Sequence, residues 1–277
     1  MKNIFYNKEN NLRGLWWIGA FFLILLVMLM PLILLSHYYS FEVSIPMQGL
    51  LVIVTTWLCQ LISKSSLFEI TGNFDLKSIK HFSVGIGIGA LLMLAPAIFL
   101  FIVKYIEFSF NNISSYVILK GVVICFSVAV TEELLFRGFI FQKLIKSIGH
   151  WPAQLAIASL FLLTHSNSLN DTGELKVWGS INIFLASIMF GTAFVQINGL
   201  ALPIGIHFMA NLMQGTVLGF GVSGQSSESI LNVKAINGPI WMHGGDFGLE
   251  ASLFGLLTLI IVITFLLRKR NLFMNLK

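Results

Sequence analysis

Charged side chains are scarce in this chain of 277 residues, because Asp, Glu, Lys and Arg together make up only 10% of it. Typical soluble domains carry about 25% charged residues. Hydrophobic residues make up 56% of the chain, and the mean hydropathy is +0.86. A soluble globule of this composition would have too few polar side chains to cover its surface. The sequence therefore predicts an integral membrane protein and argues against a soluble enzyme.

Cysteine is also rare, with two residues, Cys59 and Cys125, both inside apolar segments. There they act as small apolar side chains and predict neither a disulfide nor a metal site. The H-E-x-x-H pattern of helical zinc proteases is absent. No basic patch is interleaved with aromatic residues, so the net charge of +5 does not indicate nucleic-acid binding.

Eight apolar windows are long enough to cross a bilayer, which takes about 17–25 helical residues. They are Gly14–Leu35, Met47–Ile62, Phe82–Val103, Tyr116–Ile140, Trp151–His165, Ile181–Ile197, Leu200–Phe220 and Phe247–Leu267. The second and fifth windows are short, so seven spans are the alternative. We expect an all-α bundle of about eight transmembrane helices, surrounded by membrane lipids and forming a single domain over residues 1–277.

Basic residues gather in one set of loops and acidic residues in the other. The basic set comprises Lys2, Lys8, Arg13, Lys64, Lys77, Lys80, Lys143, Lys146, Arg268, Lys269, Arg270 and Lys277. The acidic set comprises Glu42, Glu107, Asp171, Glu174, Glu228 and Asp246. Because basic loops stay on the cytoplasmic side of a membrane, we expect both termini in the cytoplasm and Gly219–Gly245 as an outer loop.

Small residues in the third window predict close helix packing. Gly85 and Gly89 are four positions apart, a spacing that lets two helix backbones approach within a membrane. A phosphate-binding loop is excluded here, because no strand precedes these glycines.

Three ionisable residues, Glu132, Glu133 and Arg137, lie at the inner end of the mostly apolar run Val117–Ile140. Each costs about 2.5–3.5 kcal/mol at the centre of a spanning helix. Glu133 and Arg137 are four residues apart, so they can form an ion pair on one helix face. Glu132 points about 100° away and is left free to act as a general base. A purely structural polar contact between helices is the alternative.

Two later segments carry the remaining polar candidates. His165 ends the apolar run of the fifth window, and equal antiparallel arms about Gly149 would put it opposite Glu133. His207 and Asn211 are four apart in the seventh window and share a helix face. Each of these could equally be an interhelical hydrogen-bonding residue.

The six residues together suit hydrolysis by an activated water molecule. A carboxylate takes the proton from water, an imidazole orients the water, and a His/Asn pair stabilises the oxyanion. Glu132, His165 and His207 could also ligate a divalent metal ion such as Zn²⁺, and the sequence leaves metal dependence open.

Three motifs resemble those of the CAAX protease and bacteriocin-processing (CPBP, or Abi) family of intramembrane endopeptidases. Thr131–Gly138 resembles its E-E-x-x-x-R motif, Phe161–His165 its F-x-x-x-H motif and His207–Asn211 its H-x-x-x-N motif. They occur in the family's order, within an expected family core at residues 117–220.

The resemblance implies an eight-span endopeptidase whose conical cavity opens to the cytosol. It implies that Glu132 activates water and Glu133 pairs with Arg137. His165, His207 and Asn211 would position water or metal and stabilise the oxyanion. Family members cut prenylated CAAX proteins, or in prokaryotes serve in peptide processing and bacteriocin immunity. We therefore expect a lipidated or hydrophobic peptide substrate, no nucleic-acid partner, and a bacterial plasma membrane with the site open to the cytoplasm.

Three other functions were weighed against this prediction. Gly221–Gly224 matches the G-x-S-G around a rhomboid serine, here Ser223, but the only later histidine is His243 in the same loop. A non-catalytic scaffold or bacteriocin-immunity protein would use the polar residues only to bind a partner. A transporter is disfavoured, because the chain has no inverted repeat.

Overall fold

The computed structural model describes residues 5, 13–170 and 172–268, and it is mostly helical (76%). Several of the basic residues that predicted the orientation, namely Lys2, Lys8, Lys269, Arg270 and Lys277, and the acidic Asp171 lie outside the described residues. The helices are α2 (Gly14–Tyr39), α3 (Ile45–Ile62), α4 (Phe68–Thr71), α5 (Leu76–Ile102), α6 (Ser115–Arg137), α7 (Phe139–Ile148), α8 (His150–Thr164), α9 (Ser166–Asn170), α10 (Leu175–Ile197), α11 (Ala201–Asn211), α12 (Ile240–His243) and α13 (Leu253–Arg268). The shorter elements are the strands β1 (Ile106–Phe110) and β2 (Leu231–Ala235), the π-helix η1 (Leu212–Val217) and the 3₁₀ helices η2 (Gly245–Phe247) and η3 (Leu249–Ala251).

The helical fold class is confirmed, whereas the number of spans is confirmed only in part. Among the described residues, four helices are long and apolar enough to cross a membrane, namely α2, α3, α5 and α10. The apolar helix α13 has 16 residues, and at about 1.5 Å per residue it is shorter than a bilayer core. The count of eight and the orientation of the termini stay predictions.

The fourth predicted span, Tyr116–Ile140, is wrong at its inner end. Helix α6 ends at Arg137, and Gly138 adopts φ −76° and ψ −126°, outside the helical region. A Cβ at Gly138 would overlap the carbonyl oxygen of Leu134, so glycine permits this abrupt bend. The chain continues as α7, which buries Phe139, Phe141 and other apolar residues, and only Gly149 separates α7 from α8.

The glycine pair in α5 packs against α11, as the sequence predicts. A Cβ at Gly85 or Gly89 would run into the backbone of Leu202 or Ile206 on α11, so no larger residue fits without a shift. This close approach fixes α11, the helix that carries His207 and Asn211.

The expected outer loop contains a strand that the sequence did not predict. Strand β2 pairs antiparallel with β1, with Ile106 opposite Ala235 and Phe110 opposite Leu231. Each strand has only five residues, and an isolated two-stranded pair is marginally stable. It is supported by the buried Ile106 and by the contact of Phe108 with Phe220.

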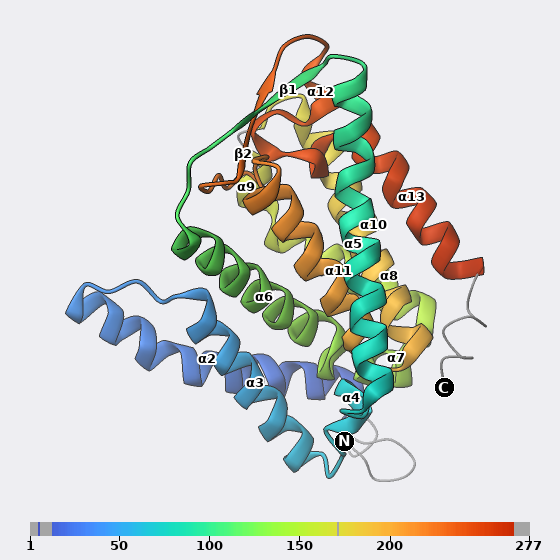
Figure 1. The fold of residues 1–277 in the computed structure, drawn as a ribbon. Helices are drawn as coiled ribbons and strands as arrows, with labels where there is room; N and C mark the ends of the chain where they lie inside the picture. Colours follow the sequence, from blue (N-terminus) through green and yellow to red (C-terminus); the bar gives the residue numbers. More distant parts are fainter. Residues whose placement is uncertain (1–4, 6–12, 171, 269–277) are drawn as a thin grey trace.

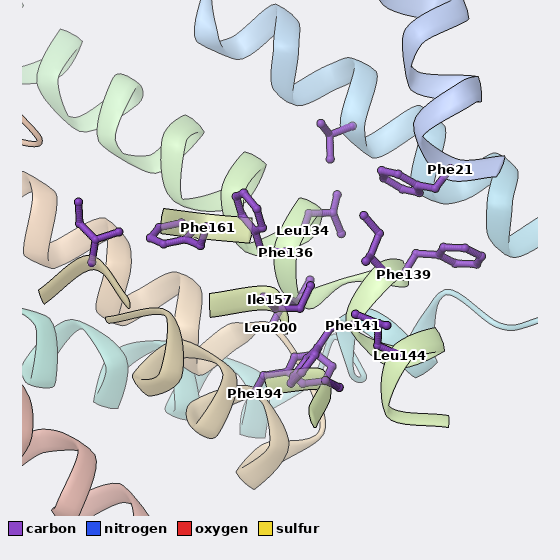
Figure 2. Packing of buried hydrophobic residues seen from close by; sticks show 14 of the residues in the cluster. Phe21, Leu134, Phe136, Phe139, Phe141, Leu144, Ile157, Phe161, Phe194 and Leu200 are labelled. Atoms are coloured by element: carbon purple, nitrogen blue, oxygen red, sulfur yellow. The ribbon is translucent and has the colours of Figure 1, made fainter. Parts of the chain in front are cut away.

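The bundle has two chemically different ends (Figure 1). One end, called here the basic end, holds α4 and α7 with Lys64, Lys143 and Lys146. The other, called here the loop end, holds β1, β2 and α12. A buried apolar cluster includes most of the apolar residues of α7, and Figure 2 shows part of it, where the rings of Phe136 and Phe161 meet edge to face at 4.9 Å.

We predict that Gly89→Leu lowers thermal stability strongly and that Gly87→Leu does not. Overpacking against a backbone typically costs about 1–3 kcal/mol, whereas a Cβ at Gly87 meets no atom within 4 Å. Thermal unfolding of both variants in detergent measures the difference. Equal losses of stability would contradict the close α5–α11 packing.

Candidate active site

The predicted ion pair on α6 is present and fully buried. Arg137 Nη1 lies 3.2 Å from Glu133 Oε1, and both side chains have no solvent exposure. Arg137 Nη2 also donates to the hydroxyl (2.7 Å) and carbonyl (3.1 Å) oxygens of Ser187 on α10. Two charges removed from water are costly unless they are paired and hydrogen-bonded, so this contact fixes α6 against α10.

Aromatic rings surround the buried guanidinium group. The rings of Phe136, Phe161 and Phe190 lie 5.7, 5.0 and 5.2 Å from Arg137 Cζ. A guanidinium group is attracted to ring faces at such distances. Phe161 is the first residue of the F-x-x-x-H motif, so two of the motifs meet at Arg137.

His207 lies between the two glutamates of α6. Its Nδ1 is 2.9 Å from Glu133 Oε1, and its Nε2 is 3.8 Å from Glu132 Oε2. The ring of Phe190 stacks on the imidazole at 4.7 Å. Because Glu133 Oε1 already accepts a hydrogen bond from Arg137 Nη1, it also serves as the acceptor for His207, and Nδ1 of His207 donates to it. Nε2 is therefore the nitrogen that can gain or lose a proton beside Glu132.

Glu132 and Glu133 have different surroundings although they are adjacent. Glu133 is fully buried, whereas the Glu132 side chain is 28% exposed and lines a cavity of about 310 Å³. Within the part of the chain that the structure describes, no donor makes a hydrogen bond to Glu132. Its carboxylate is therefore open to a water molecule or substrate in the cavity.

His165, His207 and Asn211 line the same cavity as Glu132. His165 follows α8, and its Nδ1 donates to the carbonyl oxygen of Phe161 at 2.9 Å. No described residue makes a hydrogen bond to the Asn211 amide, which leaves its N–H groups available. The structure thus brings four of the six predicted residues to one cavity, with Glu133 and Arg137 behind its wall.

The reasoning that placed His165 opposite Glu133 used a wrong premise. The connection at Gly149 is short, but the chain bends at Gly138, so the equal arms about Gly149 do not extend straight to Glu133 on α6. His165 reaches the cavity on α8, which is only 15 residues long. It faces the space that Glu132 lines, and Glu133 is not part of that lining.

The proposed zinc ligands do not form a ligand group. Among the described residues, no three His, Cys, Asp or Glu side chains are close enough together to hold a metal ion. Glu132, His165 and His207 are thus not gathered into a metal site within the described residues. Whether the protein depends on a metal ion stays a prediction.

Ser223 and His243 do not form the pair that a rhomboid mechanism needs. Ser223 Oγ donates to Glu250 Oε2 at 2.7 Å. His243 lies in α12, where its Nδ1 accepts from the Gly245 N–H at 3.2 Å, and it does not line the cavity. Ser223 is at the cavity wall but has no imidazole to take its proton.

Sequence reasoning missed Glu250, a carboxylate on the cavity wall near the loop end. It lies inside the apolar window Phe247–Leu267 that was assigned to a span. An ionisable residue in an apolar window costs free energy, and this argument identified Glu132 as a candidate. The same argument would have identified Glu250.

The exposed part of the cavity lining is confined to the loop end. Four of the lining residues are exposed, namely Ile45, Gln225, Ser226 and Ser227. Ile45 begins α3, and the other three lie in the loop after η1. None of the lining residues comes from α4 or α7 at the basic end.

These features define a membrane protein with buried acid and imidazole groups around a cavity. Residues 114–213 match the family model described as type II CAAX prenyl endopeptidase Rce1-like. The match runs from the start of α6 into η1, includes all six predicted site residues, and confirms the resemblance to the CPBP family. Searches of curated proteins and of solved structures found no match.

We predict that Arg137→Ala destabilises the protein by about 3–5 kcal/mol, because it leaves Glu133 buried without its cation. Lys146→Ala is the matched control: it breaks an ion pair of the same 3.2 Å length with Glu69, but one that is exposed. Exposed pairs contribute about 0–1 kcal/mol. Thermal unfolding in detergent compares the two variants, and similar stability of both would contradict a structural role for the buried pair.

Proposed function

We propose that this protein is an intramembrane endopeptidase that hydrolyses a peptide bond with water activated by Glu132. One observation carries the proposal. Glu132 faces the cavity, accepts no hydrogen bond from the described residues, and lies beside Nε2 of His207, while buried Glu133 binds Nδ1 of the same ring. The family match supports a protease of the CAAX endopeptidase type.

The reaction begins with a water molecule beside Glu132. The gap of 3.8 Å between Glu132 Oε2 and His207 Nε2 allows one water molecule to hydrogen-bond to both atoms. Glu132 takes a proton from this water, and the water oxygen forms a bond to the carbonyl carbon of the peptide. The carbonyl π electrons move to its oxygen, which becomes an oxyanion.

Asn211 is suited to stabilise the oxyanion, since its amide N–H groups are not used within the described protein and it lines the cavity. His165 donates Nδ1–H to Phe161, so its Nε2 is directed away from that bond and donates only when the ring is protonated. When the tetrahedral intermediate collapses, the C–N bond breaks. The proton held by Glu132 then passes to the leaving amine.

A lipidated or otherwise hydrophobic peptide fits the cavity best. Much of its lining is apolar, with side chains such as Leu92, Met93, Ile124, Val128, Ile183 and Leu259. A prenylated CAAX-type protein is one member of this substrate class, in keeping with the family that the chain resembles. Lipid is the expected surrounding, since α2 exposes large apolar side chains, among them Leu23, Val27 and Leu34.

Two predictions about orientation now exclude each other. The positive-inside rule puts the basic end in the cytoplasm, whereas the resemblance implies a cavity that opens there. The exposed lining lies at the loop end, opposite to Lys64, Lys143 and Lys146. We therefore propose a bacterial plasma membrane protein whose basic end is cytoplasmic and whose cavity opens on the other side.

A non-catalytic immunity protein is the second candidate, because the buried Arg137–Glu133–His207 contacts would also suit a rigid scaffold. A growth assay against bacteriocins separates the two. If Glu132→Gln still protects the cells, immunity depends on binding a partner and not on hydrolysis. If protection is lost, immunity depends on hydrolysis.

We predict that Glu132→Gln lowers kcat by about 100-fold or more, the usual contribution of a general base. Ser223→Ala should retain most of the activity on a peptide without a basic residue, because the one side-chain hydrogen bond of Ser223 within the described residues goes to Glu250, which takes no part in the hydrolysis. Cleavage of a fluorogenic lipidated peptide by purified protein measures both. Full activity of Glu132→Gln together with an inactive Ser223→Ala would reverse the assignment in favour of a serine protease.

We predict that Ser226→Cys reacts with a membrane-impermeant maleimide in intact cells and that Asn73→Cys reacts only after lysis. Both positions are exposed, Ser226 at the loop end and Asn73 between α4 and α5 at the basic end. The background replaces Cys59 and Cys125 by alanine. The opposite labelling pattern would mean that the cavity opens to the cytoplasm.

A further inference from the structure

Glu250 is a carboxylate on the cavity wall that the proposed mechanism does not use. It belongs to η3, between Leu249 and Ala251, both of which are fully buried. These neighbours fix the backbone, and the Glu250 side chain lines the cavity that Glu132, His165 and His207 also line. The cavity thus has an acid on each of two elements, α6 and η3.

Two neutral groups hold the Glu250 carboxylate in place. Ser223 Oγ donates to Oε2 at 2.7 Å, and Gln214 Nε2 donates to Oε1 at 3.0 Å. The same amide group of Gln214, which is fully buried, also donates to the carbonyl oxygen of Gly221 at 2.7 Å. The carboxylate is therefore oriented by η1 and by the following loop. Each oxygen keeps a free lone pair, since an ionised carboxylate can accept about four hydrogen bonds.

No cation of the described protein neutralises this carboxylate. Within the described residues, no Lys, Arg or His nitrogen lies within ion-pair distance of Glu250, and the cavity lining contains no Lys or Arg. His165 and His207 line the same cavity, beyond ion-pair distance of Glu250. Glu250 is only partly exposed to solvent, and a ligand that brings a cation into the cavity could pair with its carboxylate.

We propose that Glu250 determines substrate specificity by binding the side chain of a lysine or arginine close to the scissile bond. This inference deepens the proposed function and rests on it. The substrate lies across the cavity, with its peptide bond at Glu132 and its basic side chain at Glu250. The predicted substrate is thus a hydrophobic peptide that carries a basic residue, and the apolar lining accommodates the rest of it.

Matched peptides test this specificity. They share one apolar sequence and carry Lys, Gln or Glu at a single position that is scanned along both sides of the scissile bond. At one position we expect the parent protein to cleave the Lys peptide about tenfold faster in kcat/KM than the Gln peptide, as an enclosed charge pair would allow. Glu250→Gln should abolish this ratio and leave cleavage of the Gln peptide within about threefold. Glu228→Gln, the same change at an exposed residue of the loop that carries Ser223, should keep this ratio.

Three results would overturn the assignment. In the first, the parent protein shows no Lys preference at any position. In the second, Glu250→Gln lowers kcat/KM equally for the Lys and Gln peptides. In the third, Glu228→Gln also loses the Lys preference. If Glu250→Gln fails to fold, carbodiimide labelling of the parent protein replaces it. The Lys peptide should then protect Glu250 from modification in mass spectra, and equal protection by the Gln peptide would contradict the proposal.

Binding separates this inference from the proposed function. Uncleaved Lys and Gln peptides are titrated onto Glu132→Gln and onto Glu132→Gln/Glu250→Gln. A Lys preference that disappears in the double variant supports the cation site even if the parent protein cleaves nothing. Cleavage that depends on Glu132, without any Lys preference in binding, retains the proposed function and rejects the role of Glu250.

Discussion

The site depends on one buried series of contacts, from Arg137 through Glu133 to His207. One carboxylate oxygen, Glu133 Oε1, lies 3.2 Å from the guanidinium and 2.9 Å from the imidazole. These groups come from α6 and α11, and Ser187 adds α10 through its bonds to Arg137. Breaking any one contact would leave a charge in a medium that cannot solvate it. The three helices are therefore held in a single arrangement, and the imidazole in a single orientation.

The same contacts explain how two adjacent glutamates acquire different chemistry. Successive residues of a helix point about 100° apart, so α6 directs Glu133 into packed protein and Glu132 into the cavity. Glu133 lies 3.2 Å from the guanidinium of Arg137, whereas the one charged partner of Glu132 among the described residues is His207, at 3.8 Å. Pairs of ionisable groups in contrasting surroundings are typical of sites that transfer protons. Glu250, on another wall of the cavity, has yet another setting, because only neutral donors hold it.

Local spacing predicted the parts of the site that lie on one helix. The Glu133–Arg137 pair and the shared face of His207 and Asn211 both follow from a separation of four residues. The contact between Glu133 and His207 joins residues 74 positions apart, and no periodicity in a single sequence indicates such a pairing. The gathering of the motifs was instead implied by the family resemblance.

The errors of the sequence analysis also have physical causes. The fourth span was predicted too long because its apolar run continues past the bend at Gly138. Hydrophobicity alone does not distinguish a bent segment from a straight span. Strands β1 and β2 are five residues each and are stabilised mainly by each other and by the helix ends. Glu250 was missed because the whole apolar window around it was assigned to a membrane span.

The nitrogen-15 NMR spectrum of histidine-labelled protein tests the central contact most directly, with His207→Asn used to assign the His207 signals. As the pH rises from about 5 to about 9, the range in which histidines titrate, Nδ1 of His207 should stay protonated while only Nε2 loses its proton. A neutral ring that carries its proton on Nε2 would show that Glu133 does not hold the imidazole, and would contradict this account of the site.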